Sequence, residues 1–178
     1  MPKIIENAKE LILKTSENLL FQAGYKGFTI REVAKRCGIA SGTIFNYFSS
    51  KEMLISIIMA KDWAKFLSDM QRECNLAKDI AAGVSAIYNG IESFVKKYGS
   101  IWEDCPSNII SNFRKHHLVL RQQIADLLSD LLLRFNRKKA LPVISVFAEA
   151  VLSSAVQKDI SLPELLQFTT LLVTSTAV

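Results

Sequence analysis

The chain has 178 residues, 49% of them hydrophobic, and a formal net charge of +5. A chain of this length buries about two-thirds of its unfolded surface, which allows one domain, or one domain with a small second unit. No apolar run approaches the roughly 20 residues that cross a bilayer, and the charged start MPKIIENAKE is unlike a secretory signal. We therefore expect a cytoplasmic protein that does not engage a membrane.

Positive charge is concentrated at one end of the chain. Residues 1–51 contain 8 Lys or Arg and 4 Asp or Glu, whereas residues 52–178 contain 14 and 13. A basic N-terminal region favours a polyanionic partner, although a solvated helical surface has the same composition. The three cysteines are odd in number and lack metal-type spacing, so we expect reduced thiols and neither a metal nor a cofactor.

Helical periodicity runs through nearly the whole chain and predicts an all-α fold with about nine helices. Gly24 is placed to end the first helix in a left-handed cap, and Gly99 to end the fifth. Capping boxes of the form S/T-x-x-E begin at Thr29, Ser49 and Ser161. The helices are expected at residues 3–23, 29–38, 40–47, 50–73, 77–98, 107–113, 116–137, 141–157 and 161–176.

Residues 28–51 combine two short helices with a glycine-bearing turn, which is the pattern of a helix-turn-helix. Small residues at Ala34, Gly38 and Gly42 allow the two helices to cross closely. The second of these helices then keeps a polar and aromatic ridge for solvent, and such a helix fits the major groove of DNA. The ridge consists of Ser41, Thr43, Asn46 and Tyr47, with Phe45 partly outward.

These side chains suit contacts with a duplex. Thr43 can touch a thymine methyl or a phosphate, and Asn46 can pair with an adenine edge. Lys51, at the start of the next helix, adds its charge to free backbone N–H groups and predicts a phosphate clamp. Two alternatives stay open: Arg31 is either close to phosphate or a solvated charge, and Tyr47 either reads DNA or packs on the first helix.

The stretch GYKGFTIREVAKRCGIASGTIFNYFSSKEML closely resembles the DNA-binding region of TetR-type transcriptional regulators. The resemblance covers about a third of the chain, and its glycines, aromatic cluster and Ser-Lys-Glu fall in register. It implies a basic N-terminal DNA-binding domain at residues 1–51 and a helical ligand-binding and dimerisation domain at residues 52–178. The DNA-contact positions that it implies are Thr29, Ser41, Gly42, Thr43, Phe45, Asn46, Tyr47 and Lys51.

The chain departs from the family pattern at two positions. Phe45 stands where the family usually has a tyrosine whose hydroxyl reaches a phosphate, so we expect packing or apolar contact from Phe45 instead. Ala40 stands where a serine often caps the recognition helix. The loss of such a cap costs about 1 kcal/mol, unless Ser41 takes over the capping one residue later.

The last two expected helices are apolar nearly all the way round, so they must be buried on two sides. The resemblance implies that the second side is a partner subunit, because family members dimerise by pairing their last two helices into a four-helix bundle. A single thick core is the alternative. The expected interface residues are Val143, Phe147, Val151, Leu152, Leu165, Phe168 and Leu172.

The helices between the two ends carry aromatic stripes that indicate either core or an apolar cavity. The resemblance implies a cavity for a small-molecule inducer, which would tilt the helix that begins at Lys51 and lower operator affinity. The expected lining residues are Trp63, Phe66, Met70, Tyr88, Ile91, Trp102, Phe113 and His117.

We therefore interpret the chain as a TetR-type regulator and repressor that binds a palindromic operator in double-stranded DNA as a homodimer. An unknown small molecule would release it. The alternative is a helix-turn-helix regulator without an inducer, either constitutive or controlled by a protein partner. A helical interaction protein is a further alternative, against which the basic N-terminal region argues. An enzyme is not expected, because no nucleophile elbow, paired catalytic carboxylates or glycine-rich phosphate loop occurs.

Overall fold

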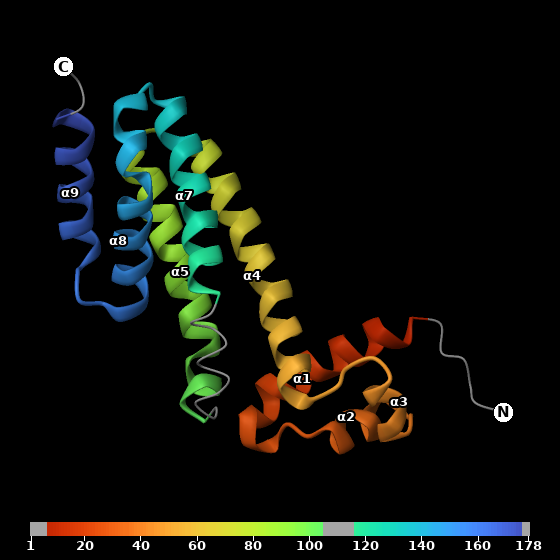
Figure 1. Cartoon of the computed structure of the whole chain (residues 1–178). Helices are drawn as coiled ribbons and strands as arrows, with labels where there is room; N and C mark the ends of the chain where they lie inside the picture. Colours follow the sequence, from red (N-terminus) through yellow and green to blue (C-terminus); the bar gives the residue numbers. More distant parts are fainter. Residues whose placement is uncertain (1–6, 105–115, 176–178) are drawn as a thin grey trace. The chain divides into compact units, whose positions relative to one another are not determined.

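The structure, a computed structural model, describes residues 7–104 and 116–175 (Figure 1). Over these residues the chain is all-α, as predicted, and contains no strand. The helix expected at residues 107–113 lies outside the described residues. The elements are α1 Ala8–Gly27, α2 Ile30–Cys37, α3 Ser41–Phe45, α4 Lys51–Leu76, α5 Ile80–Glu103, α7 His117–Arg134, the 3-10 helix η1 Lys138–Val143, α8 Ile144–Gln157 and α9 Leu162–Ser175.

The described residues gather into two compact units. The N-terminal unit contains the residues up to Trp63 together with Tyr98 to Asp104, and the C-terminal unit contains Ala64–Lys97 together with the residues from His116 onward. Both α4 and α5 therefore contribute residues to each unit. The domain boundary expected after residue 51 stays a prediction.

The first helix bends at Gly24 instead of ending there. Gly24 has φ 64° and ψ −178°, a combination open almost only to glycine, and one further turn carries the chain on to Gly27. The N–H of Phe28 donates to the Gly24 carbonyl at 3.1 Å and closes that turn. Before the bend, Ile12, Leu19 and Leu20 lie on one face of α1 and are fully buried, so the helix is held by the core of the N-terminal unit.

Two of the three expected capping boxes are confirmed. The N–H of Glu32 donates to Thr29 Oγ1 at 3.1 Å at the start of α2. At the start of α9, the backbone N–H of Ser161 donates to the Glu164 carboxylate at 2.8 Å, and the hydroxyl of Ser161 holds the pKa of that carboxyl below its usual value.

The box expected at Ser49 is wrong by one residue. The cap of α4 is Ser50, whose Oγ accepts the N–H of Met53 at 3.1 Å. The Glu52 carboxylate accepts the Tyr25 hydroxyl, at 3.3 Å, from the end of α1. Two adjacent serines offer two registers for the cap, and the sequence pattern alone does not distinguish them.

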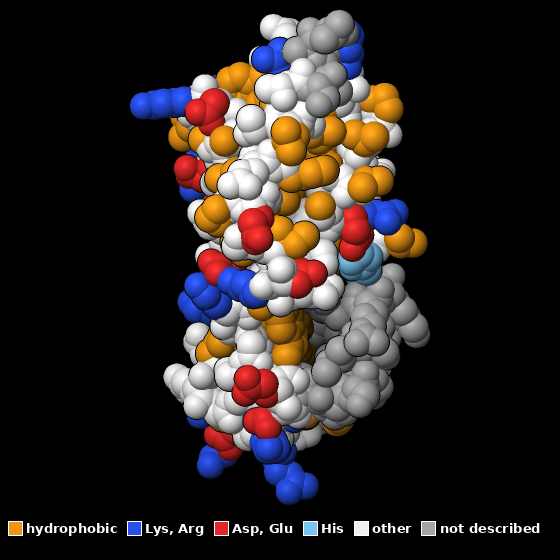
Figure 2. Space-filling model, turned by 90° about the vertical axis from the view of Figure 1, so that its left-hand side faces the viewer, with side chains coloured by type: hydrophobic (Ala, Val, Ile, Leu, Met, Phe, Trp, Pro, Cys, Tyr) orange, Lys and Arg blue, Asp and Glu red, His pale blue; other side chains and the backbone are white. Residues whose placement is uncertain are grey.

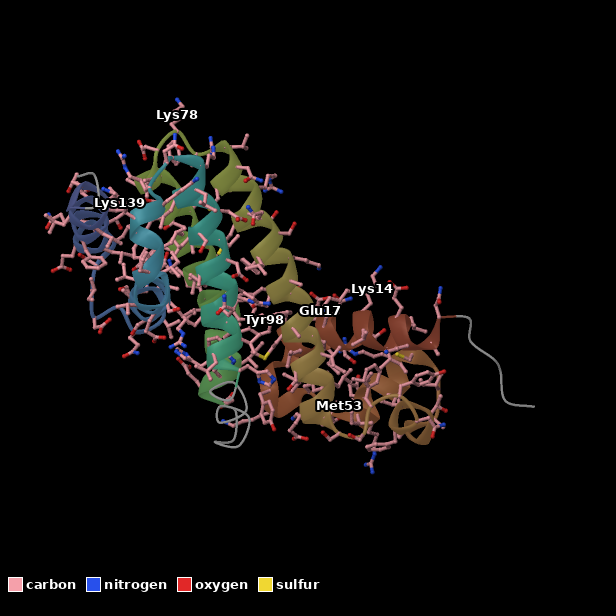
Figure 3. The ribbon with its side chains drawn as sticks, turned by 45° about the horizontal axis from the view of Figure 1, so that its top comes forward. Lys14, Glu17, Met53, Lys78, Tyr98 and Lys139 are labelled. Carbon is pink, nitrogen blue, oxygen red and sulfur yellow. The ribbon has the colours of Figure 1, made fainter. Side chains whose placement is uncertain are left out.

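The expected end of the fifth helix at Gly99 is also wrong, because α5 continues to Glu103. Beyond the glycine, Ile101 is buried and the Trp102 ring stacks on Tyr98 with their centres 6.2 Å apart. Tyr98, labelled in Figure 3, is fully buried and donates its hydroxyl to Asp62 at 2.7 Å. Burial first, and then this hydrogen bond, raises the pKa of Tyr98. Tertiary packing thus outweighs the helix-breaking preference of one glycine.

The helix expected at residues 141–157 is in two parts, because Pro142 lies in η1 and α8 begins at Ile144. The stretch Lys138–Gln157 is apolar enough to cross a membrane by length and composition. The stretch is divided between η1 and α8. One face of α8 is buried in the C-terminal unit, with Phe147, Ala148 and Val151 among its side chains.

Two glycines give a matched test of this backbone. An added Cβ meets nothing within 4 Å at Gly24 or Gly99, but only Gly24 has a positive φ. We expect Gly24→Ala to lower the free energy of unfolding by about 1–3 kcal/mol and Gly99→Ala to raise it by about 0.5–1 kcal/mol. Denaturant unfolding followed by circular dichroism measures both. Equal shifts in the same direction would contradict the described bend.

Candidate DNA-binding surface

The turn between α2 and α3 is set by Gly38, which has φ 66° and ψ 32°. Its left-handed conformation lets the Ile39 N–H donate to the Ala34 carbonyl at 3.0 Å, while its own N–H donates to Lys35 at 3.2 Å. This is the Schellman arrangement, in which glycine ends a helix and redirects the chain. The backbone therefore confirms the helix-turn-helix predicted from the sequence.

Packing fixes which side of α3 faces outward. Ile44 and Phe48 are fully buried, whereas Phe45 is 51% exposed and Tyr47 is 44% exposed. Asn46 and Gly42 are also exposed, and Ser41 and Thr43 are half-buried. We call this outward set the α3 ridge: Ser41, Gly42, Thr43, Phe45, Asn46 and Tyr47. The structure therefore brings six of the expected DNA-contact residues onto one surface.

One question raised by the sequence is answered locally, and a second, the role of Tyr47, stays open. Ala40 is the N-cap of α3, and Ser41 is its first helical residue, so Ser41 does not replace the missing cap. The Ser41 hydroxyl thus belongs to the α3 ridge. The ring of Tyr47 lies 6.4 Å from that of Phe48 and stays 44% exposed, so Tyr47 borders the core and also faces solvent.

Lys51 is held within the N-terminal unit. Its ammonium donates to the Tyr25 carbonyl at 2.6 Å and lies 3.8 Å from the centre of the Tyr25 ring. The neighbouring Glu52 carboxyl has a lowered pKa, first because of its own backbone N–H and further because of Ser50, Tyr25 and Lys51. Sequence analysis missed the role of Tyr25, because no local pattern reports a contact across 26 residues. A phosphate contact from Lys51 stays a prediction.

The remaining cations of the helix-turn-helix differ in their surroundings. The Arg36 guanidinium donates to Glu32 at 3.2 Å and to Gln22 of α1 at 2.7 Å, so it links α2 to α1. Arg31 is exposed, as is Thr29, whose side chain also caps α2. Arg31 can therefore reach a polyanion, whereas Arg36 holds α2 against α1.

The expected inducer-lining residues are divided between the two units. Met70 fills the space over Gly90, where an added Cβ would lie 2.4 Å from Met70 Cγ. Phe66 meets Phe94 edge to face at 5.6 Å. Phe113 lies outside the described residues, and the inducer site stays a prediction. Trp63 and Trp102 belong to the N-terminal unit, and Phe66, Met70, Tyr88, Ile91 and His117 belong to the C-terminal unit.

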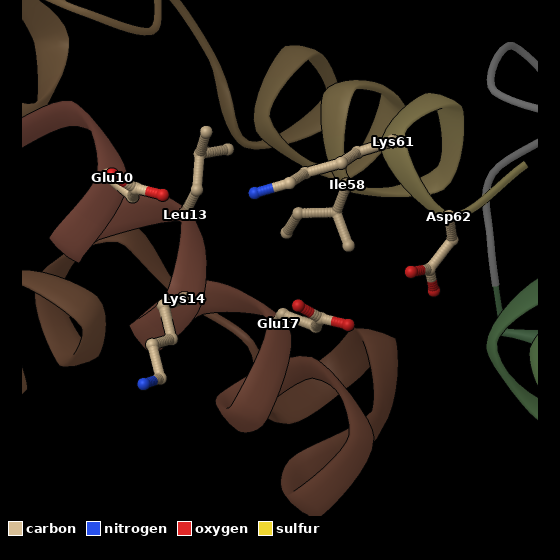
Figure 4. Close-up of a pocket in the computed structure, with 7 residues that line it drawn as sticks. All are labelled: Glu10, Leu13, Lys14, Glu17, Ile58, Lys61 and Asp62. Carbon is tan, nitrogen blue, oxygen red and sulfur yellow. The ribbon is translucent and has the colours of Figure 1, made fainter. Parts of the chain in front are cut away.

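The described hollows are lined by other residues. One, of about 220 Å³, lies between α1 and α4 of the N-terminal unit (Figure 4). Its walls carry acidic and basic side chains together with Leu13 and Ile58. A second hollow, of about 300 Å³, lies between α4 and α7 of the C-terminal unit and includes Leu67, Gln71 and Gln123. Neither contains any of the eight expected lining residues.

The expected dimer residues fall into two sets. Buried within the C-terminal unit are Phe147, Val151, Leu152 and Leu165. Val143 and Phe168 are exposed, and Leu172 is half-buried. Val146 and Leu171 are even more exposed, at 68% and 65%, and sequence analysis missed both. We call Val143, Val146, Phe168 and Leu171 the α8–α9 face. Figure 2, seen from the α9 side, shows apolar side chains gathered over these helices.

The described residues are all helical, and their helix-turn-helix with an exposed polar and aromatic α3 ridge has the architecture of helix-turn-helix DNA-binding domains. The family model for bacterial regulatory proteins of the tetR family matches residues 12–56, which contain α2, α3 and most of α1. Over these residues the chain is similar to the DNA-binding region of the tetR family. This result confirms the resemblance inferred from the sequence.

Individual relatives are more distant. The HTH-type transcriptional regulator YerO of Bacillus subtilis is 37% identical over 73 residues, which are 41% of this chain and 24% of YerO, so the match spans about a quarter of that relative. Among solved structures, the superantigen PfiT is similar with a TM-score of 0.59 and 18% identity, over 93% of this chain and 95% of that chain. The regulator FadR of Bacillus subtilis, solved with stearoyl-CoA, has a TM-score of 0.55 and 13% identity, over 94% and 97%. These similarities show the fold.

Proposed function

We propose that this protein is a cytoplasmic TetR-type repressor that binds a palindromic operator as a homodimer and leaves it when a small molecule binds. One observation supports the proposal above all others. The α3 ridge holds polar and aromatic side chains in solvent, and Phe45 and Tyr47 are about half exposed. A helix of this kind is suited to enter a major groove.

The surrounding residues fit contacts with the DNA backbone. Thr29 and Arg31 are exposed at the start of α2, the helix that crosses the phosphates in this motif. Lys51 stands in the first turn of α4, where the positive end of the helix dipole favours an anion. The Tyr25 carbonyl accepts a hydrogen bond from the Lys51 ammonium and so holds the charge at this end of α4.

Salt dependence tests the DNA contact. We expect the logarithm of duplex affinity to fall linearly with the logarithm of salt concentration, and Lys51→Met to reduce that slope by about 1. Lys139→Met, the same change at an exposed lysine of the C-terminal unit, serves as the matched control and should leave the slope unchanged. Fluorescence anisotropy with a labelled duplex measures both. The absence of duplex binding at low salt would overturn the proposal.

The α8–α9 face supports the homodimer. Its four large apolar side chains, which stand at the end of η1, on α8 and on α9, are exposed by 42% to 68%, and an apolar patch of this kind marks an interface. A two-fold dimer presents two copies of α3, which suits half-sites about 34–36 Å apart in a palindrome. Four of the expected interface residues are already buried within the unit, so they would pack behind the interface and not in it. They are Phe147, Val151, Leu152 and Leu165.

A charge placed on this face tests the interface. We expect Leu171→Asp to raise the dimer dissociation constant on the order of a hundredfold, because a two-fold axis buries the new carboxylate twice. Leu76→Asp is the matched control: Leu76 is 70% exposed and Leu171 65%, but Leu76 ends α4 and lies outside the α8–α9 face. Sedimentation velocity measures the association. A monomeric wild-type protein would contradict the proposal.

The inducer would act through α4. This helix begins at Lys51, beside the α3 ridge, and continues to Leu76, passing Trp63, Phe66 and Met70. A ligand that favours one arrangement of α4 by a few kcal/mol would change operator affinity. FadR of Bacillus subtilis, which has a similar fold, was solved in complex with stearoyl-CoA, so a fold of this kind can hold a small molecule. The close packing of Met70 on Gly90 favours the alternative, a regulator without an inducer.

Stearoyl-CoA is a suitable first probe for separating these alternatives. We expect native mass spectrometry of the purified protein to show a bound small molecule, and that molecule or the probe to weaken the operator complex about tenfold or more, which corresponds to a differential affinity of about 1.4 kcal/mol. Denatured and refolded protein serves as the ligand-free control. A protein without ligand whose operator affinity no apolar probe alters would support the inducer-free regulator.

A further inference from the structure

The α3 ridge carries no charge. Between Arg36 and Lys51 the sequence contains no Asp, Glu, Lys, Arg or His. The groups that the ridge offers to a partner are the hydroxyls of Ser41, Thr43 and Tyr47, the amide of Asn46 and the ring of Phe45. Of these, Phe45 is the most exposed of the large apolar side chains in the helix-turn-helix, at 51%.

The cations next to the ridge are engaged elsewhere. The Arg36 guanidinium lies against Glu32 and Gln22, at 3.2 Å and 2.7 Å. The Lys51 ammonium lies on the Tyr25 carbonyl at 2.6 Å. Arg31 and Lys35 are exposed but stand on α2, which in this motif crosses the DNA backbone. The recognition helix therefore meets the base edges without a guanidinium or ammonium group of its own.

This composition restricts which bases the ridge can read. Guanine is read in the major groove mainly by Arg or Lys at its O6 and N7 acceptors, and cytosine by a carboxylate. The ridge has neither kind of group. Adenine is read by a side-chain amide, and the thymine methyl by an apolar contact, and the ridge provides both in adjacent residues, Asn46 and Phe45.

We infer that the operator half-site is specified by A·T pairs where it meets α3, with Phe45 packed on a thymine methyl and Asn46 bonded to an adenine edge. The inference rests on the proposed DNA-binding function and names the base composition that this surface selects. The inference also explains the substitution of the family's usual tyrosine. Because Phe45 has no hydroxyl to bond a phosphate, its ring can contact a base instead. Adjacent residues on a helix point about 100° apart, so the two contacts fall on different bases.

Selection from a random duplex pool with the full-length protein is the first test. We expect the enriched half-sites to contain A·T pairs at the positions that α3 protects, and an Asn46→Arg variant to enrich guanine at one of those positions. Asn46 is exposed, so this change does not disturb the core. Guanine or cytosine enriched at the α3 positions by the wild-type protein would overturn the inference.

Base analogues that each remove one functional group from the enriched duplex give the sharper test. Deoxyuridine in place of the contacted thymine removes only the methyl group and should weaken binding about fourfold, and 7-deazaadenine in place of the contacted adenine removes one acceptor and should weaken it about tenfold. The first loss should vanish in Phe45→Ala and the second in Asn46→Ala. Each thymine and adenine of the half-site is replaced in turn.

The outcomes separate the two hypotheses. Tight binding that tolerates deoxyuridine at every thymine, or a loss that persists unchanged in Phe45→Ala, would overturn the thymine contact while leaving the proposed function intact. A protein that enriches no duplex from the pool and binds none at low salt would overturn the proposed function itself.

Discussion

The burial of two residues, Ile44 and Phe48, is the constraint on which the DNA-binding surface depends. They are four positions apart, close to one helical turn, and both are fully buried. Once these two side chains are fixed in the core of the N-terminal unit, Phe45, Asn46 and Tyr47 between them must face outward. Gly38 makes this packing possible, because its left-handed conformation turns the chain so that α3 lies across α2.

Charge in the N-terminal unit is arranged around this surface rather than on it. Arg36 links α2 to α1 through Gln22, and Lys51 links the start of α4 to the end of α1 through Tyr25. Both cations thereby stiffen the frame of the helix-turn-helix. The ridge itself is left with hydroxyls, an amide and aromatic rings, so the proposed function assigns direct base reading and backbone attraction to different residues.

The sequence predicted the local parts of this fold well, because their causes are local. Thr29 caps α2 through Glu32, Gly38 ends it, and Gly24 takes a positive φ. These are preferences of three or four adjacent residues, and a single sequence displays them.

Features that depend on distant residues were beyond prediction. The cap of α4 moved from Ser49 to Ser50 while Tyr25 bonded Glu52, and α5 passed Gly99 because Ile101 and Trp102 pack beyond it. The same holds for the α8–α9 face. A helix that is apolar all round predicts two buried sides, but the sequence does not tell which side packs within the subunit. Only the fold shows that Phe147 faces inward and Val146 outward.

Oxidative footprinting of the α3 ridge, with and without a duplex enriched from a random pool, tests the central claim most directly. The account predicts that Phe45 and Tyr47, both readily oxidised in the free protein, become strongly protected when the duplex is bound, whereas the buried Phe48 is unreactive throughout. Full reactivity of Phe45 and Tyr47 in the bound complex would show that another surface holds the DNA and would contradict the account.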